Sequence, residues 1–177
     1  MQPEKTGILD SRACYWTLFV LAVGALIVEN FSRFPLSVPW MKSLAAGATI
    51  LDMRPGYSES AAYALFDALG ETGRRAYLLL LWTVDLILPT LFGLFLSVAI
   101  RRGAFRRLRW IPFVASACDY GENIAITVLL LHYPAHLPAL VRFSSVLTLT
   151  KHGFYATGMV LAIGGYVRSR ILARSAQ

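Results

Sequence analysis

Long apolar runs, separated by polar segments, constrain this chain more than any other feature of its sequence. The runs cover about residues 14–31, 77–100, 110–133 and 143–167. A helix of about 20 apolar residues crosses the hydrocarbon core of a bilayer, so runs of this length are typical of membrane spans. The sequence therefore predicts an all-α, four-helix transmembrane bundle that forms a single integral membrane domain over residues 1–177.

The composition favours a membrane protein over a soluble one. Of the 177 residues, 56% are hydrophobic and only 15% are charged, whereas soluble domains are about 45–50% apolar and about 25% charged. We therefore expect the lipid bilayer to be the main partner. The formal net charge of +7 would favour nucleic-acid binding in a soluble protein. No RNA- or DNA-binding motif accompanies it, so we expect no nucleic-acid partner.

The first apolar run has two interpretations. It is cleanest over residues 15–28, which is short for a span, and a short apolar stretch after a cationic start also fits a signal peptide. No small-x-small cleavage motif follows the run, and Glu29 and Asn30 stand where one would lie. We expect the run to be retained as a span.

The distribution of lysine and arginine predicts the orientation of the spans. Five arginines lie between the second and third runs, in residues 101–109, and short cytoplasmic loops carry such an excess. The amino end and the tail hold further cations: Lys5, Arg12, Arg168, Arg170 and Arg174. We expect both termini in the cytoplasm, residues 32–74 outside, and the chain in a bacterial inner (plasma) membrane.

Residues 32–74 form the longest polar segment, and part of it has the signals of a short helix. Ser58 suits the N-cap position and Gly70 the C′ position. Five apolar residues at helical spacing would share one face: Ala61, Ala62, Leu65, Phe66 and Leu69. We expect a short extracytoplasmic amphipathic helix that lies on the outer membrane surface or lids the bundle. A long loop with a helix of its own is more often functional than idle.

Four ionisable residues lie inside the predicted spans: Asp85, Asp119, Glu122 and Lys151. Each charge near a bilayer centre costs about 2.5–3.5 kcal/mol, so such residues face the bundle interior and find partners there. At about 1.5 Å per residue, three separate helices place them about 12–15 Å below the outer boundary, with Asp119 about one turn deeper. We therefore expect their side chains to converge.

Polar or small residues recur at helical spacing on one face of each of these three spans. The three faces carry Asp85, Pro89, Gly93 and Ser97; Ser116, Asp119, Glu122, Asn123 and Thr127; and Thr148, Lys151 and Tyr155. We expect these faces to turn inward. Pro89 has no backbone N–H, so it frees the carbonyl of Asp85, four residues earlier, as an acceptor beside the ionisable residues.

The charges of these residues do not balance. Three carboxylates against one amine leave an excess of two negative charges, which a dry interior does not hold. The excess requires protonated carboxyls, a charged His152, or a cationic ligand, metal or water. The candidate ligand-binding residues are Asp85, Asp119, Glu122, Asn123, Lys151 and Tyr155. We expect a multi-pass protein whose pocket binds, transports or senses a small amphipathic or cationic ligand.

Two other functions fit the same residues. The chain is a membrane-embedded enzyme if Asp119 or Glu122 acts as acid or base and Lys151 tunes it. It is a structural or assembly subunit of a membrane complex if the polar residues only fix helix register. The sequence identifies no catalytic residue, and it leaves the cofactor, the ligand and the oligomeric state unknown.

Histidine and cysteine add no site. His132 and His136 have the i, i+4 spacing of a metal-binding pair, but Pro134 breaks the helix between them, so we expect no metal site. Cys14 and Cys118 differ in predicted depth, so we expect packing residues rather than a disulfide.

Three runs, followed by Lys151, resemble a group of uncharacterised bacterial four-span membrane proteins. The runs are YSESAAYALFDALGETGRRAY at 57–77, DLILP at 85–89 and DYGEN at 119–123. The similarity covers about residues 55–160 and implies a four-span fold without implying an activity. The architecture is also similar to that of the sterol-isomerase and sigma-2-receptor superfamily, whose members keep acidic residues in a membrane cavity, although that family's motifs are absent here.

The predicted orientation gives a labelling pattern. In intact cells, a membrane-impermeant thiol reagent should react with Ser58→Cys, because residues 32–74 are predicted to lie outside. A matched variant, Ala104→Cys in the arginine-rich loop, should react only after the cells are permeabilised. Both variants are made with Cys14→Ser and Cys118→Ser. Labelling of the position-58 variant only from the cytoplasm would overturn the orientation.

Overall fold

The computed structural model describes residues 11–175; residues 1–10 and 176–177, and with them Lys5 of the charge count, lie outside the described part. The α-helices are α1 (Arg12–Phe31), α2 (Val38–Leu44), α3 (Glu59–Trp82), α4 (Val84–Arg101), α5 (Ile111–His132) and α6 (Pro138–Ser175). Two short 3₁₀ helices, η2 (Leu51–Met53) and η3 (Arg106–Leu108), lie in the connections. No β-strand occurs in residues 11–175. The predicted all-α class is confirmed.

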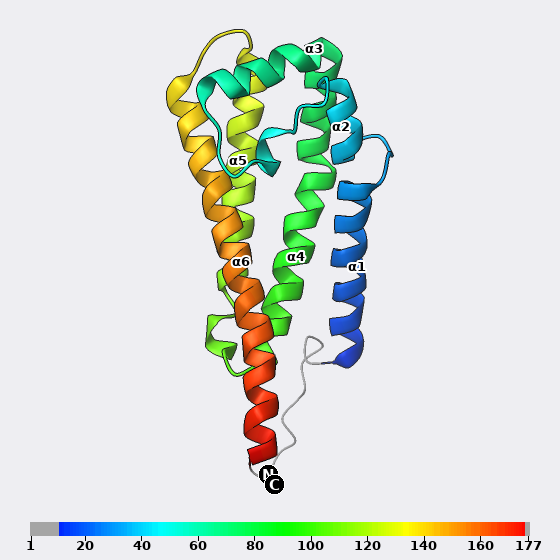
Figure 1. Cartoon of the computed structure of the whole chain (residues 1–177), viewed down its shortest axis with the longest axis vertical. Coiled ribbons are helices and arrows are strands. Elements are labelled where there is room, and N and C mark those ends of the chain that lie inside the picture. Colours follow the sequence, from blue (N-terminus) through cyan, green and yellow to red (C-terminus); the bar gives the residue numbers. More distant parts are fainter. Residues whose placement is uncertain (1–10, 176–177) are drawn as a thin grey trace.

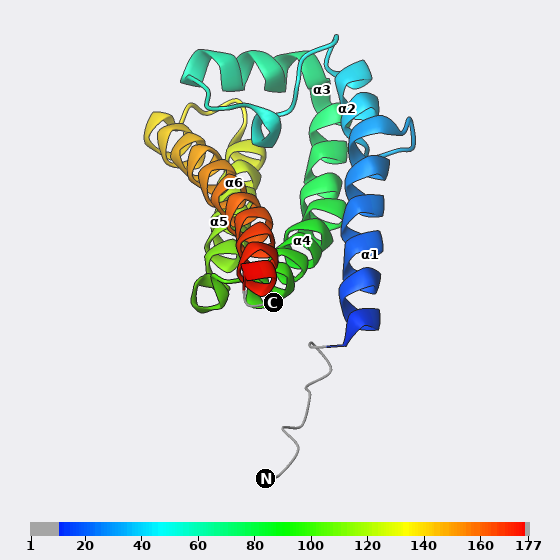
Figure 2. The same ribbon diagram turned by 60° about the horizontal axis from the view of Figure 1, so that its bottom comes forward.

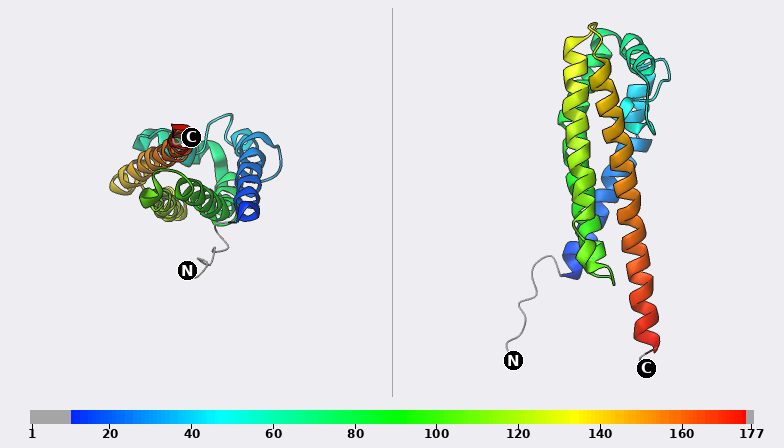
Figure 3. Two further views of the ribbon diagram at one scale, coloured as in Figure 1. Left: turned by 90° about the horizontal axis from the view of Figure 1, so that it is seen from below. Right: turned by 90° about the vertical axis from the view of Figure 1, so that its left-hand side faces the viewer.

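The helices form an elongated bundle. α1, α4, α5 and α6 run along its long axis, and the first part of α3 crosses one end, called here the capped end (Figures 1 and 2). α5 and α6 make the most extensive helix–helix contact, α4 packs against both, and α1 packs against α4. The loop of residues 101–109 closes the other end, the arginine end, and α6 continues beyond it (Figure 3).

Three helical stretches among the described residues are long and apolar enough to cross a membrane: Arg12–Phe31, Glu59–Arg101 and Arg106–His132. They contain most of the first three predicted spans, which fits a membrane protein. The fourth predicted span, residues 143–167, lies within α6. That helix is long enough at 38 residues, but it is not one of the three, because hydroxyl groups and Lys151 dilute its apolar residues.

The helix predicted after Ser58 forms and lies across the capped end. Ser58 Oγ accepts a hydrogen bond from the backbone N–H of Ala61 at 3.2 Å, as an N-cap does. Every residue of the predicted apolar face is buried except Ala61, which is half-buried. This face belongs to the main apolar core, together with side chains of residues 38–51 and of α5. The first part of α3 therefore lids the bundle.

Two backbone breaks interrupt the helical path from the lid into the bundle. Gly70 has φ 61° and ψ −173°, a conformation that is essentially restricted to glycine, and it ends the lid helix as predicted. Thr83, with φ −125° and ψ −81°, separates α3 from α4. The break at Thr83 has no glycine or proline signal in the sequence. The predicted span 77–100 consists of the end of α3 and most of α4 rather than of one helix.

The turn at Gly70 is testable by substitution. Gly70→Ala should destabilise the protein by about 1–3 kcal/mol, because a side chain strains this backbone conformation. Gly153→Ala is the matched control: a Cβ added at this helical position meets nothing within 4 Å, so stability should be unchanged or slightly higher. Thermal unfolding of the detergent-solubilised protein compares the two. Equal unfolding temperatures would show that the bundle does not depend on this turn.

Candidate functional site

Lys151 on α6 contacts two carboxylates of α5 at once. Its Nζ lies 2.7 Å from Asp119 Oδ1 and 2.7 Å from Glu122 Oε2. All three residues are buried, and Glu122 is 0% exposed. Asp119 and Glu122 are three residues apart in a helix and therefore share a face, which lets one amine reach both. The second Glu122 oxygen, Oε1, accepts a hydrogen bond from the hydroxyl of Thr148.

Asn123 connects α5 to the break between α3 and α4. Its side-chain amide donates to the carbonyl oxygens of Leu81 at 3.4 Å and Asp85 at 3.3 Å. The Asp85 carbonyl is the one that Pro89, which lacks an N–H, leaves without its helical donor. The carbonyl of Pro89 itself accepts a hydrogen bond from the Ser116 hydroxyl at 2.8 Å. The prediction that Pro89 frees an acceptor beside the ionisable residues is confirmed.

Asp85 brings a third buried carboxyl from α4. The residue is 5% exposed, and its Oδ2 has no hydrogen-bond partner among the described residues. The same holds for Oδ1 of Asn123, whose amide nitrogen is bonded to the Asp85 backbone. A buried acceptor without a donor costs about 1–3 kcal/mol. Two acceptors at this point of the interior therefore lack donors within the described chain.

Two further buried acids join the site. Glu29, near the end of α1, is 5% exposed, and Asp52, in η2, is 3% exposed. Asp52 Oδ1 accepts a hydrogen bond from the Tyr77 hydroxyl at 2.7 Å. Glu29 and Asp85 both interact electrostatically with Asp52 and with Lys151. Asp85 also interacts electrostatically with Glu29. We call the six buried ionisable residues the acidic cluster: Glu29, Asp52, Asp85, Asp119, Glu122 and Lys151.

Sequence reasoning missed Glu29 and Asp52 for different reasons. Glu29 follows the apolar residues 15–28, and an acid at the end of such a run can meet water or headgroups as readily as the interior. Asp52 lies in the polar segment 32–74, which was expected to lie outside. Its neighbours Ile50, Leu51 and Met53 are apolar, and an acid between apolar residues in a loop is a signal that the loop packs inward.

The segment around η2 covers the acidic cluster on the side of the capped end. In Figure 1 this cyan segment hangs below the lid helix, and its η2 turn packs against α6. Tyr57 fastens it: its hydroxyl donates to Ser144 Oγ at 2.7 Å, and its backbone N–H donates to Ser145 Oγ at 2.9 Å. Burial raises the pKa of the Tyr57 phenol to about 12, so the phenol stays protonated and keeps donating at physiological pH.

Tyr155, His132 and His136 have contacts other than the ion pairs of Lys151. The half-buried Tyr155 places its hydroxyl 3.4 Å from Ser116 Oγ, and its ring contacts Phe92 with centroids 5.2 Å apart. His136 Nδ1 lies 2.8 Å from Glu59 Oε1 on the lid helix. His132 Nδ1 contacts the backbone of its own helix. Of the predicted site residues, Tyr155 is therefore on the margin of the cluster.

Comparison with known proteins adds no further evidence: no family model, curated protein or solved structure matches this chain. The geometry of the acidic cluster is accordingly the basis for a functional proposal.

The two ion pairs of Lys151 should hold α6 against α5. Lys151→Met should destabilise the protein by about 3–5 kcal/mol, because it leaves buried carboxylates without a partner. Adding Asp119→Leu and Glu122→Met should restore most of that loss, since no buried charge then remains unpaired at this contact. Thermal or denaturant unfolding in detergent measures both effects.

Lys42→Met is the control for the loss of a lysine. Lys42 lies in the last turn of α2 and is only partly buried, so its replacement should change stability by no more than about 0.5 kcal/mol. A Lys151→Met protein as stable as the control would show that the ion pairs do not hold the bundle together.

Proposed function

We propose that this chain is a four-span protein of the bacterial inner membrane, with both ends in the cytoplasm, that binds a small organic cation in the acidic cluster. The observation that carries the proposal is that five buried carboxyls share the interior with a single buried amine among the described residues. If all six groups ionise, a low-dielectric interior holds a large negative charge, which is strongly unfavourable. A cation bound in the cluster reduces this imbalance.

The bound cation belongs beside Asp85. Asp119 and Glu122 are already paired with Lys151, and Asp52 accepts a hydrogen bond from Tyr77. Asp85 Oδ2 is the buried carboxylate oxygen that lacks a donor among the described residues and lies outside the Lys151 ion pairs. A cation with N–H groups supplies that donor, and it also supplies one to the side-chain oxygen of Asn123. Glu29, from α1, interacts electrostatically with Asp85, and its carboxylate would add a second negative charge for the cation.

An organic ammonium group suits this site better than a metal ion. Among residues 11–175, no group of three or more His, Cys, Asp or Glu side chains is placed to hold a metal ion. The carboxyls are therefore distributed over a larger volume than one coordination sphere. An ammonium group instead donates up to three hydrogen bonds to separate acceptors, as Lys151 does with Asp119 and Glu122.

Three features support α6 as the fourth span and α1 as a retained one. α6 carries the buried Lys151, and it packs along α5. Its other side exposes large apolar residues that suit contact with lipid: Phe143, Val146, Leu149, Met159, Val160 and Ile163. α1 contributes Glu29 to the acidic cluster, so removal of α1 as a signal peptide would remove part of the site.

Binding is favoured over acid–base catalysis because both α5 carboxylates are already engaged in ion pairs. Asp119 and Glu122, the acid or base of the enzymatic alternative, are both held by the same lysine. A general base must reach the proton that it removes, within hydrogen-bond distance. Asp85, which is not held in this way, is a binding group with a vacant acceptor.

Calorimetric titration of the purified protein with a diamine tests the proposal. We expect 1,4-diaminobutane to bind the native chain, and 1-butanol, which has a similar carbon chain without the charge, not to bind. Asp85→Asn should weaken diamine binding at least tenfold, because truncating or neutralising one partner of a buried charge pair costs about 2–5 kcal/mol.

Glu71→Gln is the matched control, because Glu71 is an exposed acid paired with Arg75 on α3. It removes the same charge and should leave diamine binding within about twofold. The proposal fails if 1,4-diaminobutane does not bind the native protein, or if Asp85→Asn binds the diamine as tightly as Glu71→Gln does.

A further inference from the structure

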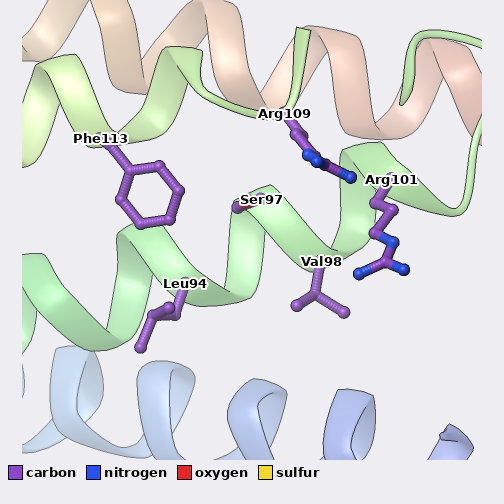
Figure 4. Close-up of a pocket in the computed structure, with 6 residues that line it drawn as sticks. All are labelled: Leu94, Ser97, Val98, Arg101, Arg109 and Phe113. Atoms are coloured by element: carbon purple, nitrogen blue, oxygen red, sulfur yellow. The ribbon is translucent and has the colours of Figure 1, made fainter. Parts of the chain in front are cut away.

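We infer that the arginine end carries a binding site for one anionic phospholipid, which would place its phosphate between Arg101 and Arg109. A half-open cavity of about 240 Å³ lies there between α4 and the start of α5. Its lining combines two arginines, one hydroxyl and three apolar side chains: Leu94, Ser97, Val98, Arg101, Arg109 and Phe113 (Figure 4). No function assigned above uses this cavity.

The two ends of the cavity differ in chemistry. Figure 4 shows the guanidinium groups of Arg101 and Arg109 on the same side of the cavity, with Phe113 and Leu94 farther along α4 and α5. A guanidinium group is a planar fork of N–H donors that matches two phosphate oxygens, and its charge is permanent. Two such groups from different chain segments can clamp one phosphate. The Ser97 hydroxyl adds a third donor in the lining.

The apolar half of the cavity selects a lipid over a free phosphate. A free phosphate ion has no apolar part that could pack against Phe113 and Leu94, whereas a phospholipid would place the start of an acyl chain against them. Phe113 is 44% exposed and the neighbouring Trp110 is 54% exposed, and a tryptophan at this level of a span is typical of the membrane interface. Basic pockets between helices at the membrane surface bind lipid headgroups by this combination of charge and depth.

The walls of the cavity come from a stretch of strongly positive charge. Residues 86–118 include five arginines and no Asp or Glu. Asp85 and Arg101 lie at opposite ends of α4, about 24 Å apart along the helix axis at the usual rise. The lipid site is therefore separate from the acidic cluster, and it stands whether or not that cluster binds a cation.

Lipid titration of the detergent-solubilised full-length protein, followed by native mass spectrometry, tests the inference. We expect dioctanoyl phosphatidylglycerol to bind at least tenfold more tightly than dioctanoyl phosphatidylcholine. Arg109→Gln should weaken phosphatidylglycerol binding at least fivefold. Arg109→Lys, which keeps the charge but removes the fork, should give an intermediate loss. Phe113→Ala should weaken the binding of both lipids. Unchanged thermal unfolding shows that each variant is folded.

Arg106→Gln is the matched control, because it removes one arginine from the same loop but lies outside the cavity lining. It should change phosphatidylglycerol binding by less than twofold. An equal loss for Arg106→Gln and Arg109→Gln would reduce the effect to general electrostatic attraction and overturn the site. Equal affinity for the two lipids would also overturn it. Glycerol 3-phosphate binding as tightly as phosphatidylglycerol would assign the cavity to a soluble phosphate compound instead of a lipid.

Discussion

The structure depends most on one buried amine. Lys151 pairs with both Asp119 and Glu122 and is the only cation among the buried ionisable residues of the described chain. These contacts fix the rotation of α6 relative to α5, since both acids lie on a single helical face. The other contacts of α6 follow from that rotation: Thr148 meets Glu122, and one turn earlier Ser144 meets Tyr57 of the covering segment. The same amine thus places the lining of the site and its cover.

The break at Thr83 places the second half of the site. Because α3 ends at Trp82 and α4 begins at Val84, Asp85 lies in the first turn of a new helix instead of the middle of a long one. A helix N-terminus favours a negative charge by about 0.3–1 kcal/mol. The carbonyl groups left around the break are met by the Asn123 amide. One asparagine on α5 therefore holds the carboxyl-bearing end of α4 beside the acids that bind Lys151, and leaves its own oxygen facing the interior.

Much of this arrangement could be predicted from residue types and helical spacing. The apolar runs and the cap residues Ser58 and Gly70 predicted the helices and the lid, because these signals are local. The spacing of Asp119, Glu122 and Asn123 predicted which face of α5 is buried, because buried charge needs partners. Glu29, Asp52 and the break at Thr83 could not be predicted in this way. The positions of the two acids result from packing between distant segments, with α1 against α4 and η2 against α6. In sequence, an acid at the end of an apolar run or in a loop looks the same whether it meets water or a core.

The separation of charge along α4 explains how one short helix contributes to two proposed sites, one for a cation and one for an anionic phosphate. Its first turn carries Asp85 and its last turn carries Arg101, so each charge lies at the end of the helix dipole that favours it. Between them the helix contributes mostly apolar side chains, with Pro89 and Gly93 buried on the inner face and the half-buried Ser97 in the lining of the cavity. About 24 Å of helix separates Asp85 from Arg101 at the usual rise, so the interaction between these two charges is weak beside the contacts that each makes at its own end. The acidic cluster can therefore attract a cation while the arginine end attracts a phosphate, and neither occupant neutralises the site of the other.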